Sequence, residues 1–207
     1  GLTILNSTKA GVYAASQNIN YDAGFDFHIP AKVFVDVNNC KISDGPVGIL
    51  NDGILGNVTA HNNDLSGNTQ YAIKAKNKSI NPVVNATCNW YGHWSGPSNN
   101  AGQGSPVLGN NVTFAPWLTS GTDNDIAEGF QPVPGSCDNN CGNKSMKIQV
   151  CHNGKTKCVS PAEAISLVAG GATVGACLPA PITSALSIVD EIITPESFSI
   201  TSFPNPF

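Results

Sequence analysis

Short runs in which apolar and polar residues alternate recur through the first 119 residues of the chain. Residues 35–43 align with residues 58–66 at a shift of 23, apolar residue on apolar residue and Asn on Asn. Residues 47–50 align with residues 71–74 at a shift of 24, and a third copy begins at Val84. Alternation with a period of two is typical of β-strands, and a repeat of this length is typical of a solenoid whose coils cover one another's core.

The segments between these runs are rich in Asn and Gly, of which the chain holds 24 and 21. Both residues disfavour helices and tolerate the left-handed backbone of tight corners. A leucine-rich repeat would need a regular frame of leucines, which residues 1–119 lack. The pattern therefore predicts an all-β fold, a parallel β-helix. The Asn pairs at positions 38–39 and 62–63 would hydrogen-bond between coils at its corners, although sugar or calcium binding is an alternative role for them.

Four aromatic residues stand where the repeat stops: Trp90, Tyr91, Trp94 and Trp117. A solenoid needs a cover at its last coil, because that coil would otherwise expose its core and an unpaired strand edge. We expect the four aromatic side chains to form this cap. A platform for carbohydrate is the alternative role.

Charge is sparse and unevenly placed. Charged residues make up 12% of the chain, the net charge is −4, and all ten basic residues are Lys. The absence of Arg together with a negative charge disfavours nucleic-acid binding. No apolar run approaches the roughly 18 residues that a membrane-spanning helix needs, so we expect no membrane span. Residues 1–119 carry six Lys and six Asp, whereas residues 120–207 carry four Lys and eight acidic residues, which indicates two modules.

Five of the seven cysteines lie within 41 residues: Cys137, Cys141, Cys151, Cys158 and Cys177. A segment this small buries little core, and exported domains of this kind are held together by disulfides. Zinc is the competing interpretation, but the spacings do not match those of a zinc ribbon or finger. We therefore expect two disulfides among the five cysteines, with the fifth pairing elsewhere or remaining a free thiol.

A hairpin is predicted around the turn formed by Asn153 and Gly154. In that register Cys151 faces Thr156 and Cys158 faces Gln149, so a bond between Cys151 and Cys158 would run diagonally. Cys177 is the expected partner of one of them. A short helix is expected to follow, because Ser160 and Pro161 form a start signal and residues 170–171, both Gly, a stop.

These patterns divide the chain into five parts. We expect the last coils and cap of the β-helix in residues 1–119, a polar and proline-rich linker in 120–140, and the Cys-rich hairpin and helix module in 141–178. A second linker is expected in 179–200. The start of a further domain is expected in 201–207.

Three segments resemble known families. Residues 81–92, 95–98 and 110–118 resemble the closing segment of secreted right-handed parallel β-helix proteins, in which a pattern of the kind N-W-W-G is followed by S-G-P and F-x-P-W-L. Tyr91 replaces the second Trp of that pattern. The resemblance implies that the β-helix is right-handed and that the aromatic residues lie at its end.

Residues 150–159 and 175–177 resemble a small module found near the ends of exported proteins of the Bacteroidota. In that module the helix is followed by H-L-x-H-G-D, and both His and the Asp are missing here, so no metal or acid-base role carries over. The final residues, Phe203, Pro204, Asn205, Pro206 and Phe207, resemble the opening of the type IX secretion sorting domain. This resemblance implies passage through the periplasm and outer membrane, with the type IX translocon and its shuttle proteins as partners. The product would be secreted or attached to the outer cell surface.

No catalytic, cofactor-binding or metal-binding constellation is recognisable in the sequence. A glycoside hydrolase needs two facing carboxylates, and Asp44 and Asp52 are the best candidates, although both precede Gly and fit turns. A β-helix polysaccharide lyase would combine acidic calcium ligands with a basic Lys or Arg, but the chain has no Arg, and Lys9, Lys32, Lys41 and Lys74 form no motif. Serine nucleophile elbows, phosphate-binding loops and the H-E-x-x-H motif are absent as well. We therefore expect a non-catalytic exported protein that contacts glycans or acts as an adhesin, with a purely structural stalk as another class. The alternative is the C-terminal part of a polysaccharide lyase or hydrolase whose active site lies upstream of residue 1.

Overall fold

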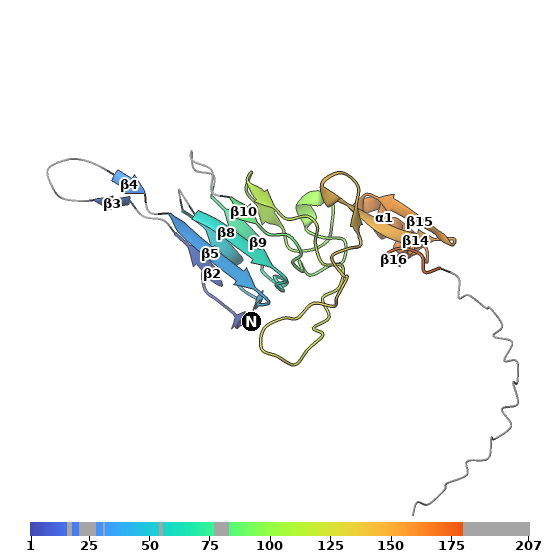
Figure 1. Cartoon of the computed structure of the whole chain (residues 1–207), viewed down its shortest axis with the longest axis horizontal. Helices are drawn as coiled ribbons and strands as arrows, with labels where there is room; N and C mark the ends of the chain where they lie inside the picture. The colour runs from blue at the N-terminus through green and yellow to red at the C-terminus, as the bar shows by residue number, and fades with distance from the viewer. Residues whose placement is uncertain (16–17, 21–27, 31, 54–55, 77–82, 180–207) are drawn as a thin grey trace, which may run out of the picture. The chain divides into compact units, whose positions relative to one another are not determined.

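The computed structural model describes residues 1–15, 18–20, 28–30, 32–53, 56–76 and 83–179, and over these ranges the chain is mostly strands with one short α-helix (Figure 1). The expected all-β class is thereby confirmed. The strands are β1 (Thr3–Leu5), β2 (Val12–Ala14), β3 (Asn18–Asn20), β4 (His28–Pro30), β5 (Val33–Asn38), β6 (Lys41–Ser43), β7 (Val47–Asn51), β8 (Gly56–His61), β9 (Tyr71–Ala75), β10 (Val84–Asn85), β11 (Val107–Leu108), β12 (Val112–Thr113), β13 (Asn140–Cys141), β14 (Lys147–His152), β15 (Lys155–Val159) and β16 (Thr173–Val174). The helix is α1 (Pro161–Ala169), and 3₁₀ turns occupy Ser98–Asn100 and Asn143–Ser145.

Two parallel sheets are built from successive passes of the chain. One has the order β12-β10-β8-β5 and the other the order β11-β9-β7-β2 (Figure 1). In the first sheet Val35 pairs with Val58, which also pairs with Val84. In the second sheet Val47 pairs with Tyr71. The shifts of 23 and 24 residues read from the sequence are therefore the actual strand registers.

A third line of pairing runs beside the two sheets. Strand β1 pairs in parallel with β6, and isolated parallel bridges continue from Lys41 to Asp64 and from Asp64 to Trp90. Inward-facing side chains from all three lines meet in one apolar core, in which Ile42, Ile49 and Val58 are almost completely buried. Alternation between more and less buried residues is clear along β5 and β8, whereas β7 is buried at all five positions.

Buried asparagines join neighbouring passes at a corner. The side chain of Asn63 donates to Asn89 Oδ1 at 2.9 Å and to the carbonyl of Val37 at 2.8 Å, and it accepts from the backbone N–H of Cys40 at 2.9 Å. Asn89 in turn donates to the carbonyl of Ala60 at 2.7 Å. Both Asn side chains are fully buried. The hydrogen bonding between passes that we expected at Asn63 is therefore present, and it serves structure because these amides satisfy buried backbone groups.

The aromatic residues at the end of the repeat differ in burial. Trp117 and Tyr91 are completely buried in the core, whereas Trp90 and Trp94 are half-buried. The Trp117 indole N–H donates to the carbonyl of Trp94 at 3.0 Å, and the Tyr91 hydroxyl donates to the carbonyl of Ala86 at 2.9 Å. Burial raises the pKa of Tyr91, which keeps its phenol protonated. These two rings fill space beneath the surface, so they offer no platform to a sugar.

The Cys-rich module is an antiparallel sheet with one helix on it. Strands β14 and β15 form the expected hairpin, in which Asn153 and Gly154 both have positive φ, as a type I′ turn requires. Strands β13 and β16 pair with β14 on its other side. Helix α1 begins where the sequence predicts, with Pro161 at its first turn and Gly170 as its C-cap.

The N-cap of α1 gives a first testable prediction. Ser160 Oγ accepts a hydrogen bond from the backbone N–H of Glu163 at 3.3 Å. Ser160→Ala leaves this N–H without its partner and should lower the free energy of unfolding by about 1 kcal/mol in urea titrations. Ser166→Ala is the matched control, because Ser166 lies inside the same helix, where alanine has a higher helix propensity than serine. Equal losses for the two variants would contradict the capping role.

Residues 120–140, which the composition predicts to be a linker, are packed against the rest of the chain. Phe130 is buried and its N–H donates to the carbonyl of Asn39 at 2.9 Å. Thr119 and Ser136 are joined by a backbone hydrogen bond of 3.0 Å. The Phe130 ring and these backbone hydrogen bonds fix two points of the segment, whereas residues 121–128 are exposed. Its role as a linker stays a prediction. One compact unit runs from Gly1 to Cys177.

Candidate functional site

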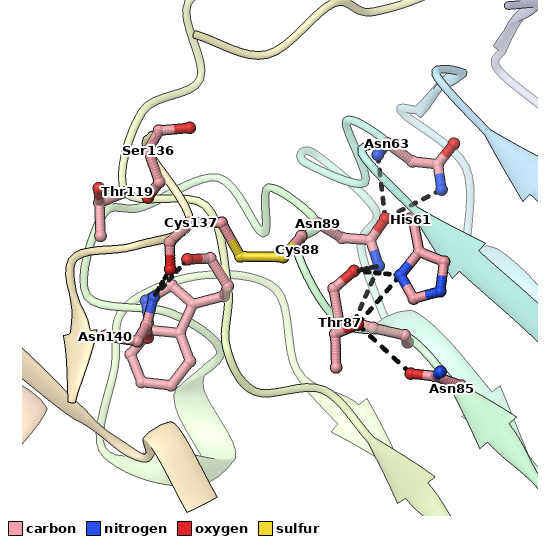
Figure 2. The surroundings of a disulfide bond; sticks show 12 residues. His61, Asn63, Asn85, Thr87, Cys88, Asn89, Thr119, Ser136, Cys137 and Asn140 are labelled. Carbon is pink, nitrogen blue, oxygen red and sulfur yellow. Dashed lines mark hydrogen bonds between the residues drawn. A yellow bond between two sulfur atoms is a disulfide. The ribbon is translucent and has the colours of Figure 1, made fainter. Parts of the chain in front are cut away.

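The cysteines singled out in the sequence are all joined in disulfides. Cys137 bonds to Cys88, which lies 49 residues earlier at the corner beside Asn89 (Figure 2). The bond ties the segment before the Cys-rich module to the corner that follows β10. Asn140 supports the same junction, because its amide donates to the carbonyl of Trp117 at 2.6 Å.

Two disulfides lie within the Cys-rich module, Cys141–Cys158 and Cys151–Cys177. The hairpin register agrees with the sequence argument, since Cys151 faces Thr156 and Cys158 faces Gln149. Cys40 is the free thiol, and it is half-buried. Over the described residues, no cluster of three or more His, Cys, Asp or Glu side chains could hold a metal ion.

The other residues named as candidates in the sequence do not lie together in one site. Phe203, Pro204, Asn205, Pro206 and Phe207 lie outside the described residues. Asp44 has a positive φ of 61° and accepts from Ser43 Oγ at 2.8 Å, which fits a turn residue. Lys32 and Lys41 lie apart from the groove described next, and His152 is a hairpin residue whose ring lies 3.3 Å from Lys157 Nζ.

The exposed face of the β5-β8-β10 sheet carries polar side chains that bond to one another, and Asp36 is the acidic residue among them. His61 Nδ1 lies 3.0 Å from both Thr87 Oγ1 and the Thr87 carbonyl, and Thr87 Oγ1 donates to Asn85 at 3.4 Å (Figure 2). Asn38 donates to Asp36 at 2.6 Å on the first strand of this sheet. No carboxylate contacts His61 among these bonds, so the arrangement gives the imidazole no acid partner.

A groove of about 300 Å³ opens on the second sheet. Its lining combines apolar residues, neutral polar residues and three lysines, and we call it the lysine groove: Thr8, Lys9, Pro46, Val47, Leu50, Gln70, Lys74 and Lys76. Strand register explains why they meet, since Leu50 on β7 pairs with Tyr13 on β2 and with Lys74 on β9. Leu50 is a buried apolar residue, only 5% exposed, that also lines the groove. It forms the floor of the groove.

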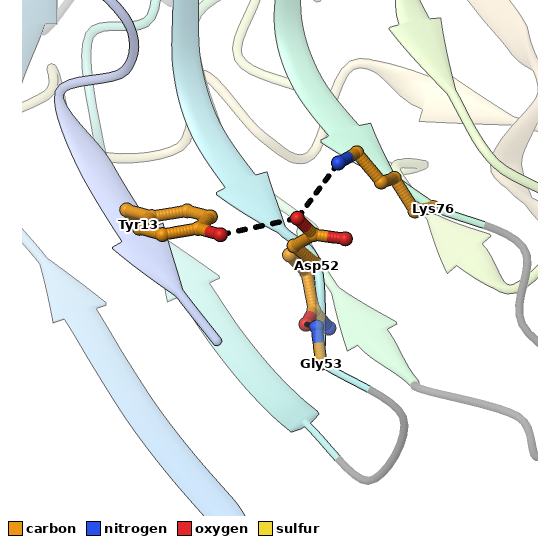
Figure 3. Close-up of polar contacts among 5 residues, drawn as sticks. Tyr13, Asp52, Gly53 and Lys76 are labelled. Atoms are coloured by element: carbon orange, nitrogen blue, oxygen red, sulfur yellow. Dashed lines mark hydrogen bonds and ion pairs between the residues drawn. The ribbon is translucent and has the colours of Figure 1, made fainter. Parts of the chain in front are cut away.

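One carboxylate stands beside the lysine groove. Asp52 Oδ2 accepts from the Tyr13 hydroxyl at 3.1 Å and from Lys76 Nζ at 2.7 Å, so the phenol and the ammonium approach the same oxygen (Figure 3). The hydrogen bond to Asp52 raises the pKa of Tyr13, and it also raises the pKa of Lys76. At neutral pH the phenol therefore keeps its proton and Lys76 its charge. This trio is suited to binding, because none of its members is a free base.

The lysine groove could not be read from the sequence. In the sequence Lys9 and Lys74 form no motif, and no pattern singles out Tyr13 or Lys76. The available signal was the repeat itself, because the shift of 24 residues brings Leu50 next to Lys74 and Asp52 next to Lys76. Lys9 needs the register of β2 as well, and that strand belongs to a less regular pass.

Comparison with protein-family models, with curated proteins and with solved structures finds no match for this chain. The structure by itself therefore defines the class, an all-β protein of parallel sheets with three disulfides between described cysteines. Such disulfides fit an extracellular or secreted protein. None of the helices in the described ranges is long and apolar enough to cross a membrane.

Proposed function

We propose that this chain is the closing part of an exported right-handed parallel β-helix that holds a glycan in the lysine groove, without catalysing a reaction on it. The observation that carries the proposal is the groove itself. It is a concave site with an apolar floor and neutral and cationic polar groups around it, on the second of the two parallel sheets.

The stacking of successive passes supports the β-helix. Val35, Val58 and Val84 form a ladder of identical residues, and each pass contributes to three lines of strand pairing. Buried amides join the passes at a corner, and aromatic side chains close the last one. These are the features expected of a solenoid whose coils complete one another's core.

The lining of the lysine groove supports binding rather than hydrolysis. Glycoside hydrolysis needs a pair of carboxyl groups across the scissile bond, whereas the residues that line this groove include no carboxylate. Asp52 stands beside it, with one oxygen engaged by Tyr13 and Lys76. The alternative, a polysaccharide lyase or hydrolase with its active site upstream of residue 1, stays a prediction.

Export by the type IX machinery is supported by two resemblances and by the disulfides. The motif Phe203–Phe207 resembles the start of the sorting domain, and the Cys-rich module resembles one found in exported proteins of the Bacteroidota. Three disulfides require an oxidising compartment. On this proposal the translocon and its shuttle proteins are the partners, and the product is secreted or surface-attached.

A truncation tests the export route. When everything from Phe203 onward is deleted, the protein should accumulate in the periplasm of a type IX-competent host, as followed by fractionation and immunoblotting. The control replaces residues 199–202 with alanine and keeps the motif, and it should be exported normally. Appearance of the truncated protein at the surface or in the medium would overturn the type IX assignment.

A further inference from the structure

We infer that the lysine groove selects acidic glycans, polymers that carry carboxylate or sulfate groups along the sugar chain. The inference rests on the proposed function, in which this groove holds a glycan, and it names the class of glycan. It follows from the positions of three ammonium groups around one apolar floor.

The charges of the lysine groove do not cancel. Three lysines line it and the adjoining carboxylate, Asp52, is bonded to Lys76 at 2.7 Å. Lys9 and Lys74 form no ion pair within the part of the chain that the structure describes. Two positive charges therefore remain for a ligand, although residues 1–119 as a whole carry equal numbers of Lys and Asp.

Aromatic rings hold these two lysines in place. Lys9 Nζ lies 4.5 Å from the centre of the Tyr13 ring, and Lys74 Nζ lies 5.2 Å from the centre of the Tyr71 ring. A cation over the face of an aromatic ring is attracted by the ring, but its charge is not balanced, whereas a carboxylate partner would balance it. The rings thus order the ammonium groups at the groove and leave them able to bind an anion.

The floor and walls fit a sugar chain better than a small free anion. Val47 and Leu50 line the bottom of the groove, and with 4% and 5% of their surfaces exposed they offer a small apolar contact to a ring placed over them. Thr8 and Gln70 supply neutral donors and acceptors for hydroxyl groups. An apolar floor also strengthens the attraction between a lysine and an anionic group above it, because it lowers the local dielectric constant.

The test compares charged polymers with uncharged counterparts. Polygalacturonate is matched with its fully methyl-esterified form, and dextran sulfate is matched with dextran, and binding is measured by affinity electrophoresis and calorimetry on the intact chain. Both acidic polymers should bind, whereas the two uncharged polymers should bind at least about tenfold more weakly. Binding should weaken further when salt is raised from about 50 mM to about 300 mM, because salt screens exposed charges.

Substitutions locate the binding in the lysine groove. Lys9→Gln and Lys74→Gln should each weaken binding of the acidic polymers about three- to fivefold, the size expected for loss of one exposed ion pair. Asp52→Asn should have the opposite effect and strengthen binding, because it frees Lys76. Lys155→Gln is the matched control, since it removes the same charge from the exposed end of β15, and it should change binding less than twofold.

The outcomes separate this inference from the proposed function. Equal binding of charged and uncharged polymers, lost on substitution of Lys74, would overturn the acidic selection and keep the glycan site. Binding of one acidic polymer and not the other would narrow the class to carboxylate or to sulfate. If none of the four polymers binds, both the inference and the glycan-binding function are wrong. Acidic binding that Lys155→Gln weakens as much as Lys74→Gln would overturn the assignment to the groove.

Discussion

Trp117→Ala should lower the free energy of unfolding by about 3–5 kcal/mol, the largest loss that we expect from any single substitution in the chain. Trp117 is completely buried among the core residues at the end of the repeat. Removing its ring leaves a cavity and also leaves the carbonyl of Trp94 without its indole donor. The backbone at Gly96 lies close beneath the ring, since a Cβ added there would stand 2.5 Å from it. This close packing limits how far the site can collapse.

Thermal and urea unfolding of the purified protein measure the effect. For a chain of this size the loss corresponds to a fall in Tm of roughly 6–20 °C. Trp90→Ala is the matched control, because Trp90 has the same side chain at the same end of the stack but is only half-buried. A variant at Trp117 with the wild-type melting curve, or with no larger loss than the Trp90 variant, would show that the ring does not close the core.

Removing the Cys88–Cys137 disulfide should cost about 4 kcal/mol, the value expected for a closed loop of 49 residues. The bond restricts the unfolded chain, and in the folded chain it fastens residues 120–137 to the corner that follows β10. The double variant Cys88→Ser and Cys137→Ser avoids leaving an unpaired thiol. Urea unfolding gives the free energy, and limited proteolysis should show faster cleavage within residues 120–136.

A second disulfide provides the comparison. Cys141 and Cys158 are separated by 17 positions, so the corresponding double variant should lose about 3 kcal/mol on the same loop-entropy argument. It should also leave cleavage within residues 120–136 unchanged. A larger loss from the shorter loop would mean that local packing, rather than restriction of the unfolded chain, dominates the contribution of these bonds.

The strand pairing could be predicted because it depends on a local pattern that repeats. The alternation around Val35 and Val58 marks inward positions, and aligning the copies gives the register. The hairpin at Asn153 and the start of α1 at Pro161 follow from residues whose backbone preferences are strong. In each case the residues that determine the local structure are close together in the sequence.

The features that escaped prediction depend on contacts between distant residues. Pairing of Cys88 with Cys137 needs the position of the segment after Leu118, and spacing along the chain does not supply it. The burial of Phe130 in the same segment could not be predicted either, because this residue is surrounded by polar residues in the sequence. The lysine groove combines side chains from three passes, so it exists only after all three registers are known.

The passes of the first sheet have unequal lengths, and this has a consequence for how the protein can evolve. The paired residues Val35, Val58, Val84 and Val112 are separated by 23, 26 and 28 positions. Pairing and the buried amides at the corner are kept while the connections between strands differ in length. A gene that encodes this stack can therefore gain or lose a few codons in a connection without disturbing the core. New surface loops can arise in this way beside a groove whose own residues stay in place.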